Sequence, residues 1–229
     1  MPGEYMMYIV IAGLLSLVGY AVQSRLKSVF QHYSRVGMRN GMTGAQVAAE
    51  MLRHYNIHDV KIVAGKGYLT DHYNPATKTV SLSESVYNNR SIAAAAVAAH
   101  ECGHAVQHAT AYSMLQMRSA LVPIVQVASG MQQYLLLAAL LFMGTFPQLL
   151  LITIIAFACT TLFSLITLPV EFDASNRALA WLESSGTTTA GEQAGAKKAL
   201  WWAAMTYVAA ALSSLVMLLY LVFRYMQSR

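Results

Sequence analysis

The longest uncharged stretch of the sequence covers residues 119–170, which are 52 consecutive residues without Lys, Arg, Asp or Glu. A helix needs about 20 apolar residues to cross the hydrocarbon core of a bilayer, so this stretch is too long for one crossing and fits two. Gly144, Thr145, Phe146 and Pro147 supply turn signals at which two helices could be divided. The stretch predicts an integral membrane protein with two adjacent spans.

Two further uncharged stretches have the length of a span, and they lie near the two ends of the chain. Charged residues make up only 11% of the chain, against about a quarter in soluble proteins, which agrees with a lipid environment. Glu4 precedes the first stretch, whereas a cleaved signal peptide begins with basic residues, so we expect an uncleaved first span. The four expected spans are about 5–24, 119–143, 148–169 and 199–223.

The polar segments between the spans, 25–118 and 170–198, are expected to form a small α+β part of one membrane-embedded domain covering residues 1–229. Helices are expected over 42–55 and 91–108, from their apolar spacing and their Thr43 and Ser91 caps. Short strands are expected at 60–63, 68–70 and 79–82, and Pro169 is expected to mark the start of a new helix. The predicted fold class is therefore mainly α, with about four transmembrane helices and a short sheet.

The positive charges predict which way the chain faces. Ten of the 15 Lys and Arg residues lie in 25–118, and four spans would place 25–118 and 170–198 on the same side. The positive-inside rule then places both polar segments in the cytoplasm, in a multi-pass protein of, by expectation, a bacterial cell membrane. The basic residues form no stripe, so we expect a lipid bilayer and no nucleic acid as a partner. Nothing in the sequence specifies an oligomeric state.

The strongest chemical motif is His100-Glu101-Cys102-Gly103-His104, which matches His-Glu-x-x-His. Residues i and i+4 share one face of a helix, so the two imidazoles can hold one Zn²⁺ per chain. Glu101 does not ligate in this motif. It can take a proton from metal-bound water and pass it to the leaving amine, which makes it the expected catalytic base. The alternative is a pair of satisfied helix histidines near the bilayer.

A catalytic zinc site needs a third protein ligand. His108 continues the histidine series, but eight residues rise about 12 Å along a helix, which is too far for one ion to reach both His100 and His108. Glu171 is the preferred candidate, because two intervening spans return the chain to the same side of the membrane. Asp173 is the second candidate, either as a ligand or as a partner that orients a ligating imidazole.

Beyond Glu171, the side chains of Asn176 and Arg177 carry polar groups that could stabilise developing oxyanion charge. An ordinary place on a polar helix surface is the alternative for both. His108 could act near the substrate or could simply lie at the interface.

The motif around His100 and the segment from Leu168 to Ser175, Leu-Pro-Val-Glu-Phe-Asp-Ala-Ser, resemble the membrane zinc metallopeptidases of the YugP type. The resemblance covers essentially the whole chain. It implies His100 and His104 as zinc ligands, Glu101 as catalytic base and Glu171 as third ligand. The chain is more distantly similar to HtpX-like and CAAX prenyl proteases, in which an Asp four residues after the glutamate supports a ligating histidine. Here Ser175 holds that place.

These patterns predict a zinc-dependent membrane endopeptidase that hydrolyses peptide bonds near the cytoplasmic face of the bilayer by Glu-assisted attack of water. Its expected substrate is a peptide or a membrane protein, held along an edge strand formed by 68–70 or 79–82. Two other functions fit parts of the pattern: a zinc hydrolase that acts on a lipid or small amide, and a catalytically inactive membrane scaffold.

Overall fold

The computed structural model describes residues 2–67, 69–142, 146 and 148–227. The described chain contains ten elements: α1 (Pro2–Tyr33), α2 (Gly44–His54), β1 (Lys61–Gly65), β2 (His72–Asn74), β3 (Thr79–Ser83), α3 (Glu84–Tyr87), α4 (Ile92–Ala109), α5 (Ser113–Leu141), α6 (Gln148–Ser184) and α7 (Ala190–Gln227). The chain divides into two compact units, and the helices α1, α5, α6 and α7 each contribute residues to both. The mainly helical fold with one small sheet confirms the predicted fold class.

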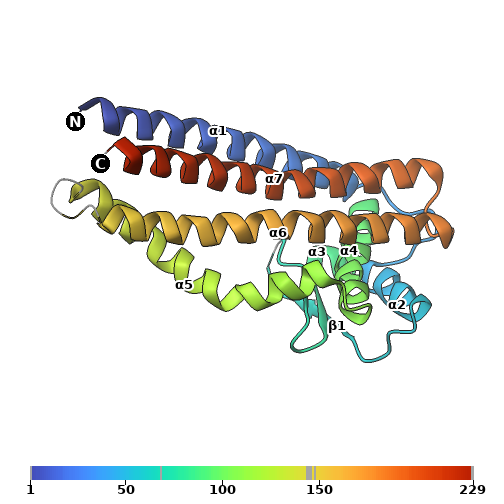
Figure 1. Cartoon of the computed structure of the whole chain (residues 1–229). Helices are drawn as coiled ribbons and strands as arrows, with labels where there is room; N and C mark the ends of the chain where they lie inside the picture. The colour runs from blue at the N-terminus through green and yellow to red at the C-terminus, as the bar shows by residue number, and fades with distance from the viewer. Residues whose placement is uncertain (1, 68, 143–145, 147, 228–229) are drawn as a thin grey trace. The chain divides into compact units, whose positions relative to one another are not determined.

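Unit 1 consists of Met1–Val22, Met117–Leu168 and Thr206–Arg229. Its helices run along one another, with both chain termini at the same end (Figure 1). Its core gathers Leu150 and Phe157 of α6 with Met217 and Leu221 of α7, and the Thr153 hydroxyl donates to the Leu135 carbonyl of α5 at 3.1 Å. Many other large apolar side chains of these helices are exposed, as helices surrounded by lipid require.

Four helices are long and apolar enough to cross a membrane, over Met6–Tyr33, Ser113–Ala139, Gln148–Ser184 and Ala190–Gln227. The number agrees with the four expected spans, although each helix extends beyond the uncharged stretch that predicted it. The expected turn at Gly144, Thr145 and Pro147 lies outside the described residues.

Unit 2 consists of Gln23–Gln116 and Pro169–Met205. Its core is built around α4, whose alanines are almost all buried against α2, the sheet and the second half of α6. Thr43 caps α2 in a capping box with Gln46, and the Ser91 hydroxyl accepts from the Ala94 amide to cap α4. Both caps are those expected from the sequence.

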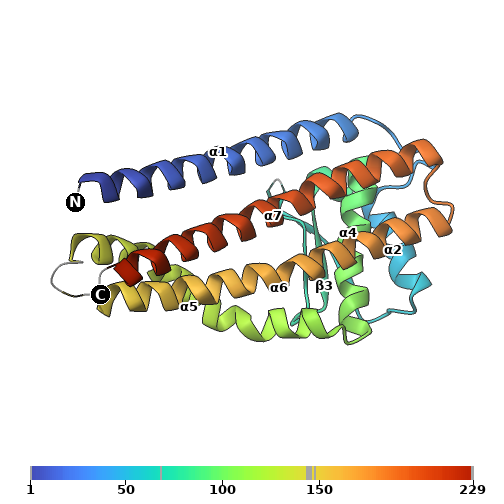
Figure 2. The same ribbon diagram turned by 45° about the horizontal axis from the view of Figure 1, so that its top comes forward.

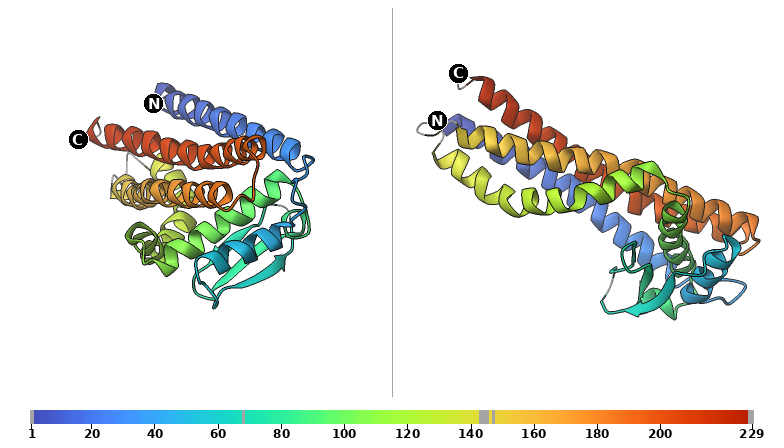
Figure 3. Two further views of the ribbon diagram at one scale, coloured as in Figure 1. Left: turned by 90° about the vertical axis from the view of Figure 1, so that its right-hand side faces the viewer. Right: turned by 60° about the horizontal axis from the view of Figure 1, so that its bottom comes forward.

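The sheet of unit 2 has the order β1-β3-β2, with β1 parallel and β2 antiparallel to β3. It lies beside α2 and α4 (Figure 3). The expected strands at 60–63 and 79–82 correspond to β1 and β3. Because β3 pairs on both sides, it is the central strand, and the expectation that 79–82 offers an edge to substrate is wrong.

The expected strand at 68–70 is also wrong for its described residues, Leu69 and Thr70, and Tyr68 lies outside them. Gly67 and Leu69 have positive φ angles of 101° and 58°, which extended strands do not adopt. The Thr70 hydroxyl donates to the Lys66 carbonyl at 2.9 Å and closes this loop. The strand that follows is β2, which forms one edge of the sheet, while β1 forms the other.

Helix α6 differs from the expectation at Pro169. Instead of ending a span there and starting a new helix, α6 continues through the proline to Ser184. A proline inside a helix removes one backbone hydrogen bond, and long apolar helices tolerate this where other polar groups compensate. The C-terminal half of α6, which belongs to unit 2, crosses α4 steeply (Figure 2). Glu171 therefore lies inside a helix and faces α4.

Candidate metal centre

The crossing of α4 and α6 depends on a glycine in the His-Glu-x-x-His motif. A Cβ atom on Gly103 would lie 2.5 Å from the backbone carbonyl oxygen of Ala174, well inside van der Waals contact. Only glycine allows so close an approach between the two helices. The histidines three positions before and one position after Gly103 are thereby held against the residues around Ala174.

Three side chains meet at this crossing: His100 and His104 of α4 and Glu171 of α6. Each offers one ligand-type atom, and these atoms lie within 4.8 Å of one another. Glu171 Oε2 lies 3.3 Å from His100 Nε2 and 3.7 Å from His104 Nε2. Glu171 is 2% exposed and His104 is 7% exposed, so the cluster is largely shielded from water. The structure thus brings together the three residues predicted as ligands.

The other ring nitrogen of His104 is held by a residue that the sequence did not single out, Gln107. The Gln107 amide nitrogen lies 2.8 Å from the Val170 carbonyl oxygen and 2.8 Å from the Asp173 carboxylate. Both of these groups can only accept hydrogen bonds, so the amide nitrogen donates to each of them. Gln107 Oε1 must therefore accept from His104 Nδ1, at 3.0 Å. This contact fixes the proton of a neutral His104 on Nδ1 and leaves the lone pair of Nε2 pointing at Glu171.

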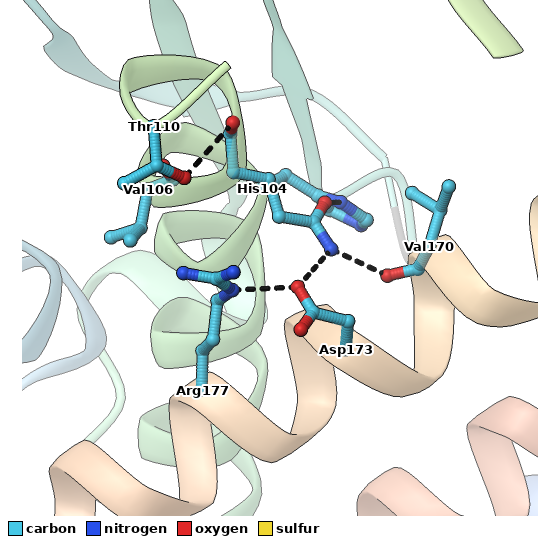
Figure 4. Close-up of polar contacts among 7 residues, drawn as sticks. His104, Val106, Thr110, Val170, Asp173 and Arg177 are labelled. Atoms are coloured by element: carbon cyan, nitrogen blue, oxygen red, sulfur yellow. Dashed lines mark hydrogen bonds and ion pairs between the residues drawn. The ribbon is translucent and has the colours of Figure 1, made fainter. Parts of the chain in front are cut away.

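His100 is oriented by a different group. Its Nδ1 lies 3.1 Å from the hydroxyl of Ser175, one turn of α6 beyond Glu171. Asp173 supports the site from further away, because it accepts from Gln107 and from Arg177 Nε, the latter at 2.6 Å. Figure 4 shows Asp173 between Arg177 and the side chains of α4. Two contacts therefore orient the imidazoles, one through Ser175 and one through Gln107.

Glu101 is buried beside the two histidines on α4. Burial raises the pKa of its carboxyl group; His100 and His104 oppose this, while Glu171 and Asp71 add to it. For His104, burial disfavours the charged ring, but Glu171 and Glu101 outweigh it and raise the pKa of the imidazole. The centre is therefore rich in carboxylate charge and favours a cation or a proton between its groups.

Asp71 reaches this neighbourhood from the loop before β2. Its carboxylate accepts from the backbone N–H of Ser83 at 2.7 Å and from the Ser83 hydroxyl at 3.0 Å. These bonds fix the start of β2 to the end of β3. The chain from Asp71 to Ser83, which precedes α4 in the sequence, is thereby tied together at its two ends.

Other predicted candidates lie outside the three-residue cluster. His108 Nδ1 is 2.7 Å from the Tyr73 hydroxyl, on the exposed end of α4. Asn176 is exposed. The Arg177 guanidinium lies 5.8 Å from the ring centre of Tyr112 and contacts Asp173, so these two side chains hold it in place. Cys102 is buried against the Ala48 carbonyl of α2, and burial raises the pKa of its thiol, which suits a packing role.

The donor set fits a zinc ion. Two imidazoles and one carboxylate are the ligand types of catalytic zinc, and three protein ligands leave a position open for water or substrate. Both Nδ1 atoms have their own contacts, so both Nε2 atoms remain to face the Glu171 oxygen. A nitrogen lone pair and a carboxylate oxygen repel each other unless a cation or a proton lies between them.

Comparisons with known proteins agree with this chemistry. Residues 6–226 match the sequence model of a family described as "Putative neutral zinc metallopeptidase". The chain is 43% identical over 212 residues to "Putative membrane protease YugP" of Bacillus subtilis (strain 168), and the match covers 93% of each chain. No solved structure matches the chain. The name of the relative and the four apolar helices both fit a membrane protein. A match over nearly the whole length places this chain in the family of neutral zinc metallopeptidases.

Proposed function

We propose that the chain is a zinc-dependent membrane endopeptidase in which His100, His104 and Glu171 hold one zinc ion and Glu101 is the catalytic base. The observation that supports this most is the arrangement of the two Nε2 atoms around one Glu171 oxygen, with both Nδ1 atoms held by other groups. Two imidazole nitrogens that face one buried carboxylate oxygen need a positive charge between them, and a zinc ion matches these three ligand types.

Zinc at this position would polarise the scissile carbonyl and acidify a water molecule. The residues of the chain would do the rest. Glu101 would accept the proton of the attacking water and return it to the leaving amine. Gln107 and Ser175 would keep the two imidazoles in their ligating orientation, so that no rearrangement is needed during the reaction. The carboxylate of Glu101 is buried, which keeps competing solvent away from this proton transfer.

The peptide substrate would lie along β2, which is one of the two edge strands of the sheet and contacts α4. An extended chain can add to an exposed edge by main-chain hydrogen bonds. β2 contacts α4, and the hydroxyl of Tyr73 in β2 bonds to His108 of the same helix. Burial raises the pKa of Tyr73 to about 12, so its hydroxyl stays protonated at neutral pH. The hypothesis that an edge strand binds the extended peptide therefore stays, and the strand proposed for this role is now residues 72–74.

The positive-inside rule supports an active site on the cytoplasmic side of a bacterial membrane, because ten of the 15 Lys and Arg residues lie in the segment that carries α4. Placing a reporter at each chain terminus tests this. Four spans place both termini on the side opposite the polar segments, so with these segments in the cytoplasm terminal reporters would be reached by a reagent that cannot cross the membrane. Protection of both termini would reverse the orientation.

The central test is Glu101→Gln, which keeps size and hydrogen bonding but removes the base. We expect cleavage of casein and of membrane-protein substrates to fall by at least about 100-fold, the usual contribution of a general base, while zinc per chain stays at the wild-type value. Glu183→Gln makes the same chemical change at an exposed position of α6 and should retain activity. Wild-type cleavage by Glu101→Gln would overturn the mechanism.

A further inference from the structure

A cavity of about 240 Å³ in unit 2 lies apart from the metal centre, between α1 and α7. It is lined by Arg25, Ser28, Val29, His32, Tyr33 and Lys198. Its walls come close together because of a second glycine. A Cβ on Gly195 of α7 would lie 2.7 Å from the ring of Tyr33 on α1. The close approach brings Lys198, one turn further along α7, to the same cavity as Arg25.

The charge in this region is positive, and acidic residues are sparse around it in the sequence. No Asp or Glu occurs between Glu4 and Glu50, or after Glu192. Within the part of the chain that the structure describes, neither Arg25 nor Lys198 forms an ion pair with a carboxylate. A second cavity of about 330 Å³ shares Ser28 and His32 and adds the exposed Arg35.

Arg25 is also held by an aromatic ring. Its guanidinium carbon lies 5.8 Å from the ring centre of Trp202 on α7. A guanidinium stacked on an aromatic face keeps the N–H groups at its edge free to donate, and these groups match two oxygens of a phosphate. The Ser28 hydroxyl offers a further donor in the same cavity.

The position of these cations along the chain indicates the source of the phosphate. Arg25 is the first charge after the uncharged residues 5–24, and Lys198 is the last charge before the uncharged residues 199–223. In a membrane protein such positions lie at the level of the lipid headgroups, where Trp residues such as Trp201 and Trp202 are also enriched. A ligand at this depth carries a phosphate and acyl chains together.

We propose that this cavity binds the phosphate of an anionic glycerophospholipid, with Arg25 and Lys198 as its two charge contacts and Ser28 as a hydroxyl donor. The acyl chains would continue beside the uncharged residues that adjoin Arg25 and Lys198 in the sequence. Such a lipid would connect α1 to α7, two helices that are far apart in the chain. The proposal does not depend on peptidase activity.

The test uses the full chain purified in a neutral detergent. Binding of short-chain phosphatidylglycerol and of phosphatidylcholine is measured by native mass spectrometry and by the change in Trp fluorescence. We expect wild type to prefer phosphatidylglycerol. The double variant Arg25→Gln/Lys198→Gln should lose about 30-fold in affinity for it, or about fivefold per cation, which corresponds to about 1 kcal/mol for each.

The matched control is Lys27→Gln/Lys197→Gln. It removes the same charge from neighbouring positions of the same helices, both of them exposed, that do not line this cavity. We expect it to bind phosphatidylglycerol within about twofold of wild type, because charges outside the cavity act only through screened, longer-range attraction. Should the cavity double variant fail to fold, the single variant Lys198→Gln is used, with the fivefold loss expected.

Three results would overturn the proposal. An equal loss in both double variants would mean a diffuse charge effect, and equal binding of the two lipids by wild type would mean no headgroup selectivity. Displacement of bound lipid by millimolar inorganic phosphate would assign the cavity to a soluble phosphate compound. Zinc per chain should stay unchanged in every variant, which separates this test from that of the metal centre.

Discussion

Gly103→Ala would test whether the close crossing of α4 and α6 builds the metal centre. The added Cβ would lie 2.5 Å from the Ala174 carbonyl oxygen, whereas ordinary contacts begin at 3.4 Å, so the two helices must separate by about 0.9 Å. The obstacle is backbone and cannot rotate away. Functional groups must stay within about 0.5 Å of their productive positions, so this separation exceeds what the site tolerates.

We expect a small decrease in the free energy of unfolding and large decreases in cleavage and in zinc affinity. Overpacking costs about 1–3 kcal/mol, and replacing glycine by alanine inside a helix returns about 1 kcal/mol, so the free energy of unfolding should fall by about 0–2 kcal/mol. Cleavage should fall by about 100-fold, because a displacement of about 1 Å has that effect on catalysis. Zinc affinity should fall as well, since His100 and His104 move away from Glu171.

The assay combines thermal unfolding in detergent, zinc titration against a competing chelator and peptide cleavage. Gly191→Ala is the control, because it makes the same change in the first turn of α7, where a Cβ meets nothing within 4 Å. It should leave zinc affinity and cleavage unchanged. If Gly103→Ala also binds zinc and cleaves as wild type does, the crossing is not set by this glycine and our explanation of the site is wrong.

Zinc content separates the roles of the other residues: Glu171→Ala should lose most bound zinc, His108→Ala should keep it, and Asp173→Ala and Gln107→Leu should weaken affinity by about 10–100-fold, as changes to groups behind a ligand do. Full zinc in Glu171→Ala with an empty site in Asp173→Ala would transfer the ligand role to Asp173. For the substrate strand, proline at Tyr73 removes one backbone donor of β2, so peptide cleavage should fall while zinc is kept. Unchanged cleavage throughout a proline scan of 72–74 would mean that substrate is positioned elsewhere.

The sequence predicted the parts of this molecule that depend on local patterns. Four apolar stretches gave four helices of spanning length, and Ser91 caps the histidine helix as expected. The i and i+4 spacing of His100 and His104 placed both rings on one face of α4. Because two spans separate Glu171 from the histidines, the sequence indicated that Glu171 would lie on the same side of the membrane as they do. The structure brings Glu171 next to His100 and His104.

The parts that the sequence did not predict depend on contacts between distant segments. Gln107 has no signal in the sequence, because its importance comes from reaching Val170 and Asp173 on another helix. A search for polar residues one turn beyond the second histidine could have suggested it. The choice of edge strand failed because β1 pairs in parallel with β3, a register that short apolar runs do not specify. Pro169 did not mark a helix boundary, because a long apolar helix tolerates a proline where other polar groups compensate for the lost hydrogen bond, and α6 continues through it.

The two imidazoles are oriented by uncharged groups, and this has a consequence for zinc. Ser175 contacts His100 directly, and the negative charge of Asp173 reaches His104 only through the neutral amide of Gln107, with Arg177 bound to the same carboxylate oxygen. A carboxylate placed directly on a ligating imidazole raises its basicity and strengthens its bond to the metal. Ser175→Asp should therefore bind zinc about 10-fold more tightly than wild type, and Ser175→Ala about 10-fold more weakly, because outer contacts change affinity by this order. The same chelator competition measures both. The opposite ranking would mean that repulsion between Asp at 175 and Glu171, one turn apart on α6, outweighs the gain at His100.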